Sequence, residues 1–195
     1  MFEGLRQLFS NRSFLLLVII FFLATGVFNM ITTYIELIVI PRGYDSIFAG
    51  ILGMLMIIGG IIGILFMSIL SDKLNKQKNI LFFSLTISTI SVLVFSFAFN
   101  DLLLMLSSFF FGFGLMGATP LALEYAINIT EPVPEATSNG ILLMMGNIGG
   151  IALIIGLENI KSAGDYFPAL ILQTTFLAIC VILAFFVEES KVKKK

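Results

Sequence analysis

Six long apolar runs constrain this chain more than any other feature of its sequence. Each run is close to the ~20 residues that an α-helix needs to cross the hydrocarbon core of a bilayer. No run alternates apolar and polar residues as the strands of a membrane β-barrel do. The sequence therefore predicts an all-α membrane protein with six transmembrane helices. The predicted spans are residues 14–40, 47–70, 80–99, 102–123, 133–157 and 168–187.

The composition supports a membrane location and narrows the function. Of the 195 residues, 58% are hydrophobic and 12% are charged, which is about half of the roughly 25% that soluble domains carry. The net charge of −1 gives no electrostatic reason to expect a nucleic acid partner. The chain has no His, which excludes imidazole-based zinc sites and Ser-His-Asp triads, and its single Cys180 excludes a disulfide within the chain. We predict no enzymatic activity, no metal site and no cofactor.

The distribution of Lys and Arg predicts the orientation. Nine of the eleven lie before the first span, between the second and third spans, or after the sixth. Arg42 and Lys161 are the two on the other side. Because basic residues concentrate in cytoplasmic loops, we predict a multi-pass protein of the cell membrane with both termini in the cytoplasm. Residues 1–13 then form a cytoplasmic segment, 14–187 the transmembrane domain and 188–195 a basic cytoplasmic tail.

Glycine is concentrated on two of the predicted spans. In lipid, glycine lets the backbones of two helices approach closely. Two interpretations of the pattern stay open. The glycines pack helices together within the chain, or they make spans two and five an interface between subunits. The ten glycines are Gly50, Gly53, Gly59, Gly60 and Gly63 on span two, and Gly140, Gly146, Gly149, Gly150 and Gly156 on span five.

A motif follows the second span. Residues 68–78 read Ser-Ile-Leu-Ser-Asp-Lys-Leu-Asn-Lys-Gln-Lys. This segment resembles the Gly-x-x-x-Asp-Arg-x-Gly-Arg-Lys signature of the major facilitator superfamily, with Ser and Asn in place of the two glycines. A solvated basic loop would explain the lysines but not an acidic residue at the end of the helix. The resemblance implies a gating or structural role for Asp72, Lys73 and Lys76.

A second motif joins spans four and five. Residues 124–142 read Glu-Tyr-Ala-Ile-Asn-Ile-Thr-Glu-Pro-Val-Pro-Glu-Ala-Thr-Ser-Asn-Gly-Ile-Leu. They resemble the segment between the tenth and eleventh helices of the feline leukaemia virus subgroup C receptor (FLVCR) family. The resemblance covers the whole chain as the C-terminal half of a twelve-helix transporter. It implies a 3+3 inverted repeat and adds Glu124, Glu135 and Ser138 to the gating motif.

Polar side chains at membrane depth are candidates for substrate binding. Asn29 and Asn147 each lie ~21–23 Å along a predicted span, at ~1.5 Å per residue, so they share a layer near the midplane. In the family, these positions carry a Tyr and a Gln of the cavity. The alternative role for each Asn is an interhelical hydrogen bond. The full predicted site is Asn29, Thr32, Thr33, Asn147 and Gln173, with Thr25 and Thr119 as further candidates.

The family carries choline and ethanolamine, with haem also proposed, so the resemblance implies transport of a small organic solute by alternating access. No acidic residue reaches mid-depth, which favours passive or substrate-driven transport over proton coupling. Six helices form only half of such a cavity. Either two copies assemble as a homodimer through spans two and five, or an N-terminal half is missing. The alternative function is a non-transporting membrane scaffold or assembly protein.

Overall fold

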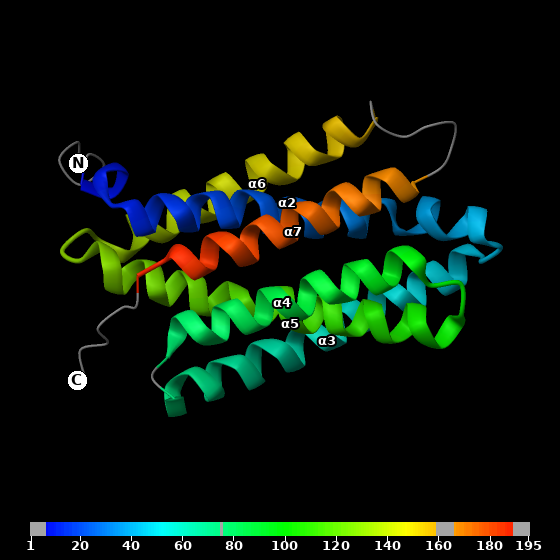
Figure 1. The fold of residues 1–195 in the computed structure, drawn as a ribbon, viewed down its shortest axis with the longest axis horizontal. Helices are drawn as coiled ribbons and strands as arrows, with labels where there is room; N and C mark the ends of the chain where they lie inside the picture. The colour runs from blue at the N-terminus through cyan, green and yellow to red at the C-terminus, as the bar shows by residue number, and fades with distance from the viewer. Residues whose placement is uncertain (1–6, 75, 159–165, 189–195) are drawn as a thin grey trace.

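The computed structural model describes residues 7–74, 76–158 and 166–188, and six long helices account for most of them. All six are long and apolar enough to cross a membrane, which confirms the predicted number. We call the end of the bundle where α2 begins and α7 ends the inner end, and the opposite end the outer end (Figure 1). The helices are α2 (Arg12–Val39), α3 (Ser46–Leu74), α4 (Gln77–Phe97), α5 (Asp101–Thr130), α6 (Glu135–Glu158) and α7 (Phe167–Phe186), with a 3-10 turn, η1 (Ile40–Arg42), after α2.

Side-chain caps define where several helices begin. The Asn11 side chain accepts a hydrogen bond from the backbone N–H of Phe14 at the start of α2. Asn100 does the same for Leu102 at the start of α5. Short polar side chains at this position satisfy N–H groups that have no partner within the helix.

The ends of the helices differ by one to seven residues from those of the predicted spans, most of all at the end of α5. The apolar run predicts that the fourth span ends at residue 123, but α5 continues to Thr130. Hydropathy registers only the part suited to hydrocarbon, whereas the helix itself continues until the proline-containing segment that follows. The fifth span was predicted from residue 133, but α6 begins at Glu135. Val133 is outside the helix because the residue before a proline disfavours helical geometry, and the carbonyl oxygen of Pro134 accepts the first hydrogen bonds of the helix, from Thr137 and Ser138.

The packing of the helices follows the predicted inverted repeat. The closest pairs are α3 with α5 and α2 with α6, followed by α4 with α5, α4 with α7 and α2 with α7. Exchanging the first three helices for the last three leaves this set of neighbours unchanged. The fold is therefore a 3+3 inverted repeat, in which α3 and α6 form opposite edges of the bundle (Figure 1).

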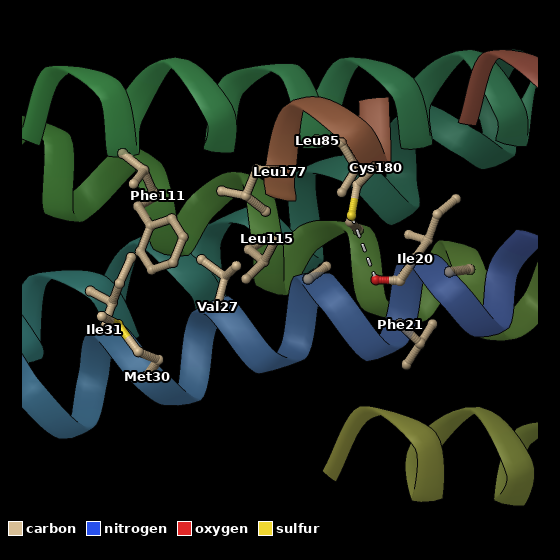
Figure 2. Close-up of a cluster of buried hydrophobic side chains, with 14 of the residues drawn as sticks. Ile20, Phe21, Val27, Met30, Ile31, Leu85, Phe111, Leu115, Leu177 and Cys180 are labelled. Atoms are coloured by element: carbon tan, nitrogen blue, oxygen red, sulfur yellow. Dashed lines mark hydrogen bonds between the residues drawn. The ribbon is translucent and has the colours of Figure 1, made fainter. Parts of the chain in front are cut away.

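The core lies where α2, α4, α5 and α7 meet. Figure 2 shows apolar side chains from all four helices in this region, among them Val27, Leu85, Phe111 and Leu177. Cys180 is buried there as a free thiol, with its Sγ 3.9 Å from the carbonyl oxygen of Ile20. Close packing of this kind holds helices together in lipid, where there is little hydrophobic drive between them.

The glycines of α3 and α6 divide into two groups. A Cβ on Gly59 or Gly63 would collide with the backbone of α5, and a Cβ on Gly149 would collide with the backbone of α2. Gly60, Gly146 and Gly150 likewise face side chains of α5 or α2. Packing within the chain thus explains these six. The other four, Gly50, Gly53, Gly140 and Gly156, have nothing within 4 Å of an added Cβ.

Candidate functional site

A groove of about 160 Å³ lies between α2, α4 and α5. Its α2 side includes Phe21, Thr25 and Phe28, and its α5 side includes Met116 and Thr119. Twelve residues line the groove, and the two threonines are the only polar ones. No charged side chain contributes to it. The groove therefore suits a small solute with an apolar body and a few hydrogen-bonding groups.

A proline shapes the α5 side of this groove. Pro120 lies inside the helix, directly after Thr119. Because proline has no N–H, the carbonyl of Met116 loses its helical hydrogen-bond partner. The Thr119 hydroxyl lies 3.3 Å from the carbonyl oxygen of Leu115. The hydroxyl donates to this carbonyl oxygen, so its own oxygen is left to accept a hydrogen bond at the groove.

The predicted residues of α2 continue from the groove toward the outer end. Asn29 is half-buried, and its Nδ2 lies against Gly150 of α6. Thr32 is exposed, and its hydroxyl donates to the carbonyl oxygen of Phe28 at 2.8 Å. Thr33 is also exposed. The spacing of Thr25, Asn29 and Thr32 puts these three side chains on one face of α2.

Asn147 lies at a similar depth on α6 but faces outward. Its side chain is exposed, and its Nδ2 donates to the carbonyl oxygen of Leu143 at 2.9 Å. Asn147 is three residues before Gly150, the residue that faces Asn29. Since α2 and α6 both begin at the inner end, the two amides lie within ~5 Å of one another in depth. The structure thus puts them in one layer but on different surfaces.

Gln173 stands apart from the other predicted residues. It is 1% exposed and lies on the core side of α7, in line with Leu177 and Cys180. Its Oε1 is buried and has no hydrogen-bond partner among the described residues. Gln173 does not line the groove.

The predicted gating residues all lie near the inner end, on separate elements. Asp72 and Lys73 are exposed on the last turn of α3, and Lys76 is exposed just before α4. Glu124 and Glu135 are exposed on α5 and α6. Since α3 and α6 form opposite edges of the bundle (Figure 1), one chain does not bring Asp72 to the start of α6.

Ser138 differs from the other gating residues because it is fully buried. Its hydroxyl lies 2.8 Å from that of Thr130, at the end of α5. The pair joins α5 to α6 across the short connection between them. Sequence reasoning predicted Ser138 at this helix start but not its partner.

Arg42 organises the outer end in a way that the sequence did not indicate. Its Nη1 donates to the carbonyl oxygens of Phe95 at 2.8 Å and Ala98 at 3.0 Å, at the end of α4. A cation near the C-terminal carbonyls of a helix is favourable. Next to it, the Tyr44 hydroxyl donates to the Asp101 carboxylate at 2.9 Å. This hydrogen bond raises the pKa of Tyr44.

The comparisons with known proteins identify the family. The sequence matches the Major Facilitator Superfamily over residues 1–154 and again over residues 43–195. The chain belongs to the major facilitator superfamily. Its fold agrees: the superfamily transporter FucP in its outward conformation has a TM-score of 0.78 at 18% identity, over 97% of this chain and 46% of FucP. The D323A mutant of the nucleoside transporter NupG has a TM-score of 0.77 at 17% identity, over 93% of the chain and 46% of NupG.

The relatives confirm the resemblance to the FLVCR family. The chain is 29% identical to the choline/ethanolamine transporter flvcr2a of Danio rerio, over 98% of the chain but 42% of that protein. It is 31% identical to solute carrier family 49 member A3 of Xenopus tropicalis, over 78% of the chain and 32% of that protein. It thus spans less than half of these superfamily relatives. An uncharacterized protein of Archaeoglobus fulgidus is 27% identical over 94% of the chain and 83% of its own length.

Proposed function

We propose that the chain forms half of a transporter that moves a small organic solute across the membrane by alternating access. The observation that carries this proposal is the groove between α2 and α5. These are the first helices of the two repeats, and the groove places two threonines in an otherwise apolar lining. The inner end faces the cytoplasm in this proposal, in accordance with the positive-inside rule.

A second six-helix half would cover α3 and α6. Asn147 lies in the middle of α6, on an exposed face that is otherwise apolar around it. An amide facing hydrocarbon without a full set of hydrogen-bond partners is unfavourable. A protein surface or a water-filled cavity over this face would remove that penalty.

The second half comes either from a second copy or from a longer chain. In the homodimer that we propose first, α3 of each copy packs on α6 of the other, as a closed two-fold requires. The archaeal relative supports a half-length form, because this chain covers 83% of it. The relatives more than twice as long as this chain support instead a second half that belongs to the same, longer chain.

The groove and the relatives together suggest a small amino alcohol as the solute. Choline and ethanolamine, which the name of the Danio rerio relative gives as substrates, each carry one hydroxyl and one ammonium group. The faces of Phe21 and Phe28 can contact an ammonium group, while Thr25 and Thr119 can bond the hydroxyl. No acidic side chain lines the groove, so the solute gradient, rather than proton coupling, would drive transport.

Uptake of labelled choline and ethanolamine into proteoliposomes tests the proposal, with a nucleoside and fucose as comparison solutes. We expect Thr25→Val and Thr119→Val to reduce uptake about twofold to tenfold each, the effect of one lost hydrogen bond. Thr175→Val is the matched control, because this threonine is exposed on α7 and outside the groove. Uptake no greater than that of empty liposomes for every solute would favour the scaffold alternative.

A further inference from the structure

Three lysines gather at the inner end, where α4 begins and α7 ends. Lys73 is exposed on the last turn of α3 and Lys76 just before α4, and the Nζ of Lys78 lies 5.6 Å from the ring centre of Phe185. We call these three lysines the inner basic patch. Asp72 is the only acidic residue between Asp45 and Asp101, and the first turn of α4 has none.

Exposed aromatic rings border the inner basic patch. Two lie on the second turn of α4 and two at the end of α7. Their exposed fractions are 37% for Phe82, 51% for Phe83, 65% for Phe185 and 59% for Phe186. A Lys beside exposed apolar rings at the end of a membrane helix matches the boundary between lipid headgroups and acyl chains.

Four acidic residues, Asp72, Glu124, Glu131 and Glu188, lie toward the same end of the bundle as the patch. The Asn128 amide donates to Gln77 at 3.2 Å, and Glu124 of α5 and Glu131 just after α5 each lie about one turn from this contact. The Glu188 N–H donates to Ser13 of α2 and its carbonyl accepts from Tyr125 of α5, so the backbone at the end of α7 is held toward these two helices. Within the connection itself, residues 72–78, three lysines stand against the single carboxylate of Asp72.

The positive-inside rule does not account for this gathering. That rule requires basic residues on the cytoplasmic side, but it does not require them to gather at one part of the inner end of the bundle. The other inner connection, between α5 and α6, carries Glu131 and Glu135, and no Lys or Arg occurs from residue 79 to 160. At the outer end, Arg42 is turned inward onto the carbonyls of α4. Among the described residues, the inner basic patch brings three lysines together with exposed aromatic rings of two helices.

We propose that Lys73, Lys76 and Lys78 bind the headgroup of one anionic phospholipid, whose acyl chains lie along the exposed rings of α4 and α7. Lysine ammonium groups donate charge-assisted hydrogen bonds to phosphate oxygens. Each basic residue near an anionic lipid surface strengthens binding by a factor of roughly five. The proposal does not depend on the solute or on transport.

Lipid binding to the purified, delipidated chain tests this proposal by native mass spectrometry. The probes are phosphatidylglycerol and phosphatidylcholine with identical acyl chains. We expect phosphatidylglycerol to bind at least about tenfold more tightly, and the preference to weaken at high salt. Lys78→Gln should weaken phosphatidylglycerol binding roughly fivefold, and Gln at all three positions should abolish the preference.

Two control variants separate this site from general charge attraction. Arg at all three positions keeps the charge and should keep the preference. Arg12→Gln removes one charge from an exposed position at the same end, on α2, and should change nothing. Equal binding of the two lipids, or an unchanged preference in the Lys78→Gln variant, would overturn the proposal. Equally tight binding of soluble glycerol phosphate would also overturn it, because the site would then recognise phosphate rather than lipid.

Discussion

The helices α3 and α6 each carry glycine on two faces, and the two faces behave differently. On the face toward the bundle, Gly59 and Gly63 lie against the backbone of α5, and Gly149 lies against the backbone of α2. On the opposite face, Gly50 and Gly140 have nothing within 4 Å of an added Cβ. Glycine therefore allows close packing of helices on one face, while the glycines of the other face contact no part of the chain. A count of glycines along a span cannot separate the two.

The open faces also distinguish these helices from the rest of the bundle. In the most apolar window of each helix, 33% of α3 and 22% of α6 is buried, against 56% of α2 and 50% of α5. The helices with the most glycine are thus the least covered. This contrast predicts that substitutions on the two faces have opposite consequences.

Gly149→Ala should have the largest effect on stability, because Gly149 lies on the face of α6 that packs closely against α2. The added methyl group would collide with the carbonyl oxygen of Phe22, which is backbone and cannot turn away. The helices α2 and α6 would have to separate. We expect a loss of about 1–3 kcal/mol in the free energy of unfolding, as for an overpacked core, measured by thermal or denaturant unfolding in detergent.

Gly140→Ala is the matched control on the open face of the same helix. It meets no neighbouring atom, and alanine favours a helix over glycine by roughly 0.5–1 kcal/mol. The isolated chain should therefore be equally or slightly more stable. Similar destabilisation by both substitutions would mean that the two faces do not differ.

The next largest effect concerns the two amides near mid-depth. Asn29 faces the closed contact between α2 and α6, whereas Asn147 lies on the open face. If both contribute to the solute pathway, Asn29→Leu and Asn147→Leu abolish uptake into proteoliposomes and leave membrane insertion and folding intact. Uptake is measured alongside thermal unfolding of each variant.

Asn128→Leu controls for the loss of an ordinary interhelical hydrogen bond. Its amide bonds Gln77 at 3.2 Å, near the inner end. We expect a small loss of stability, ~1 kcal/mol, with transport retained. Normal uptake by both the Asn29 and the Asn147 variants would assign these amides to structure alone.

Local properties made the fold predictable from the sequence. The length of each apolar run predicts a span, and the arrangement of glycines and short connections is compatible with the inverted repeat that the helices form. What a side chain faces depends instead on how the helices pack, which a single apolar run does not show. Gly53 and Gly59 are six residues apart in one run, yet they face different surroundings.

The site was less predictable for the same reason. Asn29 and Asn147 stand out because amides are rare in apolar runs, and the structure does put them at similar depth. Phe21 and Phe28 line the groove, but a phenylalanine in an apolar run resembles any lipid-facing residue. Pro120 offered a signal that sequence reasoning missed, since a proline inside a span frees a carbonyl oxygen.

Cross-linking between two copies tests whether the open faces meet. The pairs are Gly50 with Ile155 near the outer end, and Ile69 with Gly140 near the inner end, each changed to Cys in a Cys180→Ser background. Ile69 and Gly140 are each five residues from the inner end of their helix, ~7.5 Å in depth. We expect both pairs to link differently tagged copies, as detected by gel electrophoresis.

A pair on the closed faces is the negative control. Gly146 faces Thr25, and Gly59 faces Phe109, within the same chain. Cysteines at these two positions should not link copies, which also rules out Gly146 as a reporter of the dimer. If neither open-face pair links and the purified protein is monomeric, the covering half comes from a longer chain.

The smallest effect is expected at Asp72, which continues the open face to the inner end. It follows Gly50, Met54, Ile61 and Leu65 at alternating intervals of four and seven residues, so these positions share one face of α3. In the proposed homodimer, its carboxylate reaches the start of the partner's α6. A carboxylate near free helical N–H groups contributes ~0.3–1 kcal/mol when exposed. Asp72→Asn should therefore reduce linking of the inner pair, Ile69 with Gly140, about twofold to fivefold.

The outer pair reports whether Asp72 acts locally. Linking of Gly50 to Ile155 should not change in the Asp72→Asn variant, because those positions lie at the opposite end. Glu135 begins α6 and repels a second carboxylate there, so Glu135→Gln should increase linking of the inner pair. Asp101→Asn removes a carboxylate at the outer end and should affect neither pair. Equal losses at the inner and outer pairs would show instead that Asp72 supports the whole interface, and a local gating contact would be the wrong interpretation.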